Sequence, residues 1–161
     1  MGVIEDRIAE LGYVLPPPIV PPPGVVLPFE FVKIVGDRAV LSGHGPQASD
    51  GSVAGPFGQV GTDVSVDDAY AAARLTALSM FGSLHRALGS LDRIVGWVRL
   101  FGMVNSAPGL DRQPAVINGC SDLVIEVFGA DVGAHTRSAV GMAALPFGIP
   151  VEIEGEVQIR A

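Results

Sequence analysis

Two residues near the carboxyl end of the chain, Arg137 and Glu152, have side chains suited to acid–base or anion-binding chemistry. Arg137 directly precedes the apolar run 138–142. A guanidinium in such an apolar segment is rarely buried without a hydrogen-bonding or charged partner. Glu152 lies in the segment 151–158, where apolar and polar residues alternate as in a strand with one buried face. A turn at 145–148 separates the two segments. If the two predicted strands pair across this turn, the cation and the carboxylate can face one small cleft.

Both residues also have a purely structural interpretation. Arg137 could form an ion pair with Glu152 or Asp122 and hold a subunit interface together. Glu152, Glu154 and Glu156 share one face of the predicted strand, and a row of carboxylates is commonly a solvated surface. The residues alone leave these alternatives open.

Three helices are predicted from apolar spacing and from their end signals. Residues 3–12 form a short amphipathic helix that should dock on the body of the protein. The main helix begins after Ser65, a good N-cap residue, and ends at Gly89. A further helix spans 112–128 and stops at Gly129.

The remaining apolar segments predict strands. Two short runs, 29–35 and 38–42, flank a Gly-Asp pair and indicate a β-hairpin, and 94–104 forms one long strand. The order is therefore hairpin, helix, strand, helix, strand, strand, which predicts an α+β sandwich with two helices on one face of a sheet. The chain is 48% apolar and only 17% charged, so we expect neighbouring copies to cover the other face.

Seven prolines lie within residues 16–28, the Pro-rich arm. Proline has a fixed φ and no N–H, so this arm must be extended and polyproline-like. It could be a ligand for SH3 or WW domains, but a rigid arm lying along the domain is the favoured interpretation. We therefore divide the chain into 1–28, the amino-terminal helix and arm, and 29–161, the main domain.

Charge and cysteine content limit the classes of partner. The net charge is −7 and Lys33 is the only lysine, so no basic surface for nucleic acid is expected. The single cysteine, Cys120, excludes an intrachain disulfide and favours a cytoplasmic protein, and its helical spacing predicts a packed thiol. No apolar run of 18 residues and no signal peptide are found, so no membrane association is expected.

Several segments together resemble the YjgF/RidA family, whose members are also named endoribonuclease L-PSP or translation inhibitors. The resemblance spans about residues 25–160, and the block from Arg137 to Glu154 is its most specific part. The matching segments are LSGHGP (41–46), the helix from Asp67, Val104-Asn105-Ser106, VINGCSDLVIEVFG (116–129) and TRSAVGMAALPFGIPVEIE (136–154). The resemblance implies a chorismate-mutase-like fold with one mixed sheet, and homotrimers with clefts between subunits.

The resemblance also implies roles for individual residues. Arg137 would bind the carboxylate of a 2-imino or enamine acid, because a guanidinium offers a bidentate fork. Glu152 would position or activate the water that attacks the imine carbon. Ser42, Asn118 and Ala139 would contribute to substrate binding. The products would be a 2-keto acid and ammonia, and no metal or organic cofactor is implied.

Two departures from the family pattern affect the substrate. Ala139 stands where several deaminase members have a cysteine, so only its backbone N–H could serve a ligand. The aromatic residue near the family's amino terminus has no clear counterpart, since Tyr13 and Phe29 flank the Pro-rich arm. Ser42 and Asn118 could equally be turn and helix-cap residues.

Three functions follow from these observations. A trimeric imine deaminase requires both Arg137 and Glu152. A non-catalytic binder of small carboxylates, or a regulatory protein, requires Arg137 but tolerates loss of Glu152. RNA cleavage ranks lowest, because the acidic chain has no alternation of basic and aromatic residues for holding RNA.

Overall fold

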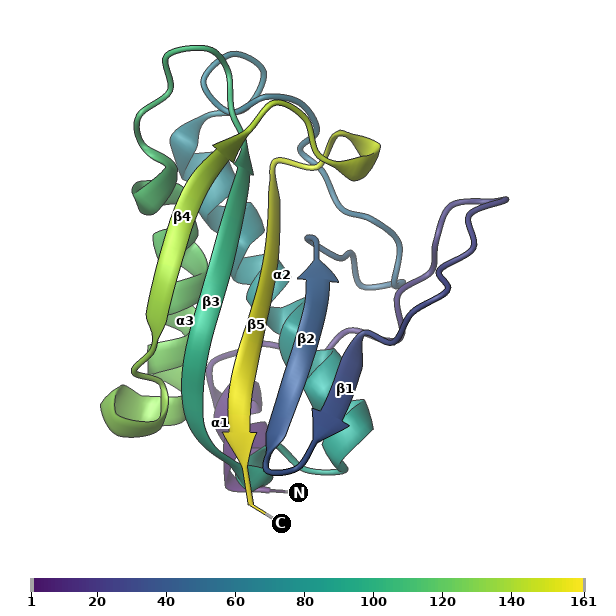
Figure 1. Ribbon diagram of the computed structural model, residues 1–161, viewed down its shortest axis with the longest axis vertical. Helices are drawn as coiled ribbons and strands as arrows, with labels where there is room; N and C mark the ends of the chain where they lie inside the picture. The colour runs from purple at the N-terminus through teal and green to yellow at the C-terminus, as the bar shows by residue number, and fades with distance from the viewer. Residues whose placement is uncertain (1, 161) are drawn as a thin grey trace.

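The computed structural model describes residues 2–160, which form an α+β sandwich (Figure 1). One mixed sheet carries two long helices on one face, as predicted. In chain order the elements are α1 (Val3–Glu10), β1 (Val32–Val35), β2 (Arg38–His44), α2 (Val66–Leu88), the 3₁₀ turn η1 (Leu91–Arg93), β3 (Ile94–Asn105), α3 (Gln113–Val132), β4 (Thr136–Met142), the 3₁₀ turn η2 (Pro146–Gly148) and β5 (Val151–Ile159).

Within residues 2–160, the sheet has five strands in the order β1-β2-β5-β3-β4. All neighbours are antiparallel except β3 and β4, which are parallel and connected through α3. The last strand, β5, therefore runs through the centre of the sheet, between β2 and β3. This order leaves β1 and β4 as the two edges.

The predicted helix ends are largely confirmed. The Ser65 hydroxyl accepts a 3.0 Å hydrogen bond from the Asp68 N–H and caps α2, and Gly89 takes a left-handed conformation (φ 79°) at its end. In α3, Gly129 leaves the helical conformation, and one further turn follows it to Val132. Asp92 of η1 accepts hydrogen bonds from the N–H groups of Val3 and Ile4, the first two residues of α1, and so anchors the start of that helix.

The core lies between the sheet and the two long helices. Phe81 of α2, Trp97 of β3 and Phe128 of α3 pack edge to face, with ring centroids 5.3–5.8 Å apart. Cys120 is fully buried in the same core, and burial raises the pKa of its thiol to about 12. The prediction of a packed thiol is confirmed.

The face of the sheet opposite the helices is uncovered in the described chain (Figure 1). Glu152, Glu154 and Glu156 lie on it, because the intervening residues of β5 point into the core. The register places Phe101 and Met103 of β3 beside Glu154 and Glu152. No helix within residues 2–160 is long and apolar enough to cross a membrane.

The predicted hairpin is confirmed by the antiparallel pairing of β1 and β2, but two details of the strand prediction differ from the structure. Residues 29–31 precede β1 instead of belonging to it. The Phe31 carbonyl still accepts from the Ser42 N–H at 3.0 Å, and its ring packs on His44 of β2 with ring centroids 5.1 Å apart. The predicted pairing of 138–142 with 151–158 does not occur, because β3 lies between β4 and β5. The intervening turn crosses the end of β3 instead of closing a hairpin.

Candidate active site

Arg137 lies on the edge strand β4 with its side chain directed at α3. One guanidinium nitrogen donates to Asn118 Oδ1 at 2.7 Å and to the Pro114 carbonyl at 3.2 Å, and another donates to Ser121 Oγ at 3.0 Å. These acceptors are all neutral. None of the salt bridges found within residues 2–160 includes Arg137. The contacts fix the direction of the guanidinium and leave its charge uncompensated within one chain.

The ion pairs considered for Arg137 are absent from the described chain. Asp122 instead accepts a 2.8 Å hydrogen bond from the Tyr70 hydroxyl. Glu152 points to the other face of the sheet. The structural alternative for Arg137 therefore finds no support within a single chain.

A hydrogen-bonded chain behind Arg137 involves two residues that the sequence analysis missed, Ser121 and His135. His135 Nδ1 lies 2.7 Å from the Gly133 carbonyl, which can only accept, so this nitrogen carries the proton. Its Nε2, 2.9 Å from Ser121 Oγ, then accepts the hydroxyl proton when the ring is neutral. The lone pairs of Ser121 remain available to Arg137. The spacing of Ser121 three residues after Asn118, on one helix face, is a signal that could have identified it.

Glu152 lies near the start of β5 against the backbone of Gly43. A Cβ added at Gly43 would collide with the Glu152 carboxylate, so the absence of a side chain there makes room for it. No hydrogen bond or ion pair to this carboxylate is found in the described part of the chain. Burial, and to a smaller extent the neighbouring charge of Glu154, raises the pKa of Glu152.

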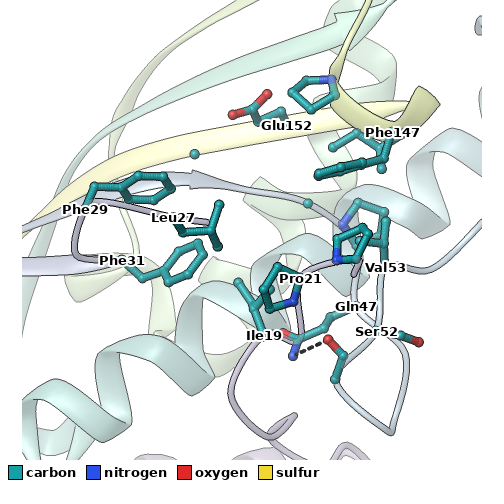
Figure 2. A pocket seen from close by; sticks show the side chains of 17 residues that line it. Ile19, Pro21, Leu27, Phe29, Phe31, Gln47, Ser52, Val53, Phe147 and Glu152 are labelled. Atoms are coloured by element: carbon teal, nitrogen blue, oxygen red, sulfur yellow. Dashed lines mark hydrogen bonds between the residues drawn. The ribbon is translucent and has the colours of Figure 1, made fainter. Parts of the chain in front are cut away.

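The Glu152 carboxylate borders an apolar cavity of about 310 Å³ (Figure 2). The Pro-rich arm, the segment that leaves β2, and the turn η2 form its walls. Among the lining residues that the structure describes, Glu152 is the only ionisable one. The full lining is Ile19, Pro21, Pro22, Leu27, Phe29, Phe31, Gly43, Gly45, Pro46, Gln47, Gly51, Ser52, Val53, Pro146, Phe147, Ile149 and Glu152.

Ser42 lies next to this cavity but does not line it. Its hydroxyl donates to the Glu30 carbonyl at 2.7 Å and ties the segment before β1 to β2. The adjacent His44 is buried between the Ser42 carbonyl and Ser83 Oγ, and burial lowers its pKa to about 4. In a single chain, Ser42 therefore has the structural role that the sequence also allowed.

The structure brings Arg137 together with Asn118 but separates both from Glu152. On β3, Arg137 is opposite Leu100 and Glu152 is opposite Met103. Their Cα atoms thus lie about 10 Å apart along the strands and about 10 Å apart across them. Arg137 and Ala139 share the helix-covered face, whereas Glu152 is on the open face. One chain therefore cannot bring the two side chains into one small cleft, and the cleft considered for two directly paired strands does not form.

The described side chains offer no group of three or more His, Cys, Asp or Glu residues that could hold a metal ion. What the arrangement provides is an oriented cation at one edge of the sheet and a partly desolvated carboxylate in an apolar cavity. The first suits binding of a carboxylate, and the second suits proton transfer.

Comparisons with known proteins agree with this architecture. Residues 9–149 match the family described as "YjgF/chorismate mutase-like, putative endoribonuclease". The chain is 38% identical to Protein TCP17 of Trypanosoma cruzi, over 99% of this chain and 96% of that protein.

Two solved structures are similar over nearly the whole chain. Atu1372 of Agrobacterium tumefaciens, whose function is unknown, is 39% identical, with a TM-score of 0.87 over 99% of this chain and 94% of that chain. A "putative endoribonuclease" of Shewanella oneidensis MR-1 is 29% identical, with a TM-score of 0.87 over 98% of this chain and 100% of that chain. The sheet order, the two helices on one face and the matched residues thus lead to one assignment: this chain belongs to the YjgF/RidA family.

Proposed function

We propose that this protein hydrolyses reactive 2-imino or enamine acids to 2-keto acids and ammonia, in clefts between the subunits of a homotrimer. The observation that carries the proposal is the Arg137 guanidinium, which three neutral acceptors orient and no carboxylate of the described chain neutralises. Such a group suits a substrate carboxylate, to which its remaining N–H groups can donate charge-assisted hydrogen bonds.

The need for more than one chain follows from the separation of Arg137 and Glu152. The two residues lie on opposite faces of the sheet, so a substrate that contacts both must lie between copies. The uncovered sheet face and the unpaired edge of β4 are surfaces on which a second copy can pack. A cyclic assembly in which β4 of one copy approaches β5 of the next would complete such a site.

The chemistry assigns a proton-transfer role to Glu152. As a water oxygen forms a bond to C2 of the imine, the carboxylate accepts the water proton, and the C=N electron pair moves to nitrogen, which is protonated. The proton that nitrogen gains is the one that Glu152 took from water, so the product is a neutral carbinolamine. Its hydroxyl proton then passes through Glu152 to the amino nitrogen, the C–N electron pair moves to nitrogen as the C=O bond forms, and ammonia leaves with the 2-keto acid. The raised pKa of Glu152 makes its carboxylate a stronger base than an exposed glutamate.

The proposal is tested by following hydrolysis of 2-imino acids generated in place by an amino-acid oxidase. Wild type should accelerate the reaction, whereas Arg137→Ala and Glu152→Ala should not. Matched controls are Arg160→Ala and Glu10→Ala, which alter exposed residues away from both sites and should retain full activity.

Two other outcomes would change the assignment. Binding of a 2-keto acid that requires Arg137 but is unaffected by Glu152→Ala, without any hydrolysis, would indicate a carboxylate-binding protein. A monomer by light scattering at the assay concentration, with activity retained, would contradict the cleft between subunits.

A further inference from the structure

The Pro-rich arm forms one wall of the cavity beside Glu152 (Figure 2). Ile19, Pro21, Pro22 and Leu27 of the arm face the opposite wall, to which Phe147 of η2 belongs. The arm is therefore part of the surface that any ligand of Glu152 would contact.

The arm is anchored to the body at its beginning. The Pro17 carbonyl accepts a 2.7 Å hydrogen bond from Gln47 Nε2, and the Pro16 carbonyl accepts a 2.9 Å bond from Arg86. The Val20 N–H donates to the Gly51 carbonyl at 2.9 Å. Because proline fixes φ, this wall loses little conformational entropy when a ligand contacts it.

In the opposite wall of the cavity, the backbone is strained at Phe147. Phe147 has φ 59°, a left-handed conformation that is unfavourable for an aromatic residue. A 2.7 Å hydrogen bond from the Gly58 N–H to the Gly148 carbonyl holds the adjoining peptide. The ring of Phe147 lines the cavity and is 51% exposed, so it stands at the opening.

Among the described residues that line the cavity, Glu152, Gln47 and Ser52 are the only ones with polar side chains. The amide of Gln47 is occupied by the Pro17 and Gly51 carbonyls and by Ser79 Oγ. The Ser52 hydroxyl donates to Asp50. The Ser52 oxygen and the Glu152 carboxylate are then the only side-chain groups of this lining left to accept a hydrogen bond, and none is left to donate one. A polar or charged ligand side chain would therefore lose more hydration than these groups replace, which disfavours such ligands.

The volume restricts the size of the occupant. About 310 Å³ corresponds to roughly ten water molecules at liquid density, which is the low end for small-molecule pockets. A branched aliphatic or an aromatic side chain fits this space and fills more of it than a methyl group does.

We propose that the Pro-rich arm is a specificity element that closes an apolar side-chain pocket, so that this protein prefers 2-imino acids with large apolar side chains. This inference rests on the proposed function, because it places the reacting carbon of the substrate next to Glu152. The apolar side chain enters between Leu27 and Phe147, while the carboxylate extends toward Arg137 of a second copy.

The test compares imino acids derived from leucine and phenylalanine with the one derived from alanine. Wild type should show a kcat/KM about ten-fold or more higher for the larger substrates. Leu27→Glu places a charge in the pocket and should abolish that preference. Val26→Glu is the matched control, because Val26 is the adjacent arm residue but is 82% exposed and outside the cavity. It should behave like wild type.

A second readout separates failure of this inference from failure of the proposed function. Calorimetric binding of 4-methyl-2-oxopentanoate and of pyruvate needs no turnover, and the first should bind about ten-fold more tightly in wild type but not in Leu27→Glu. Hydrolysis of all three imino acids with equal kcat/KM would overturn the inference and leave the proposed function intact. Preferential binding without hydrolysis would support the pocket and refute the deaminase. Equal binding of both keto acids would also overturn the inference.

Discussion

Arg137 and Glu152 differ in how the protein holds them. The guanidinium of Arg137 is oriented by three hydrogen bonds to α3 and is backed by Ser121 and His135. The carboxylate of Glu152 has no such partners among the described residues and lies half-buried in an apolar cavity. The cation is thus fixed in position, which suits binding. The carboxylate is tuned by desolvation, which suits proton transfer.

The strongest way to test this comparison is Glu152→Gln, which keeps the size of the side chain and removes the base. We expect kcat for imine hydrolysis to fall by about 10³-fold, within the range of general acid–base catalysis, while KM stays within about two-fold. Steady-state kinetics with a leucine-derived imino acid measures both constants. An increase in KM with kcat unchanged would make Glu152 a binding residue.

The complementary change, Arg137→Lys, retains the positive charge but removes the planar guanidinium group. We expect a loss of about 10²-fold in kcat/KM, mostly through KM, because a lysine cannot form two parallel hydrogen bonds to a carboxylate. Calorimetry with a 2-keto acid should show the same loss of affinity. If the lysine variant binds as well as wild type, charge alone is sufficient and the oriented fork is unnecessary.

A smaller effect is expected from the residues behind Arg137. Ser121→Ala removes one acceptor of the guanidinium, and we expect KM to increase about five- to ten-fold with kcat little changed. Ser121→Thr restores the hydroxyl and should recover most of the affinity, which a general loss of folding would not allow. Ser49→Ala, an exposed loop serine, is the control.

The smallest expected effect concerns stability and pH. Burial raises the pKa of Glu152 in the folded protein above its ordinary value of 4.5, which the unfolded chain retains. Between these two pKa values, the unfolded chain binds fewer protons at this position than the folded protein does. Ionised Glu152 therefore destabilises the fold above this interval, and the destabilisation disappears at lower pH. We expect Glu152→Gln to raise Tm by roughly 1–2 °C at pH 7 and to leave it unchanged at pH 4. Calorimetric scans at equal protein concentration check this, and a lower Tm at pH 7 would contradict it.

The elements of the fold were largely predictable because their signals are local. The hydroxyl cap at Ser65 and the left-handed Gly89 follow from residue type, and the alternation in 151–158 identifies β5. Strand order is not local. Consecutive segments commonly pair, but β5 inserts between β2 and β3, where both of its edges are hydrogen-bonded.

The candidate site was only partly predictable for the same reason. Residue type and position identified Arg137 and Glu152, and the family resemblance added Asn118. The structure brings Arg137 and Asn118 together. Ser121 and His135 can be recognised as part of the site only from their contacts in the fold, because Ser121 bonds to Arg137 and His135 bonds to Ser121. The cavity beside Glu152 depends on where the Pro-rich arm folds back, which its composition does not specify.

We expect a complete site to need Arg137 from one chain and Glu152 from another. Mixing the inactive variants Arg137→Ala and Glu152→Ala under conditions of subunit exchange tests it directly. In a cyclic trimer with equal random mixing, about one quarter of the sites should combine an intact arginine with an intact glutamate, so about one quarter of wild-type activity should return. No recovery, with mixed oligomers demonstrated by mass spectrometry, would contradict the account.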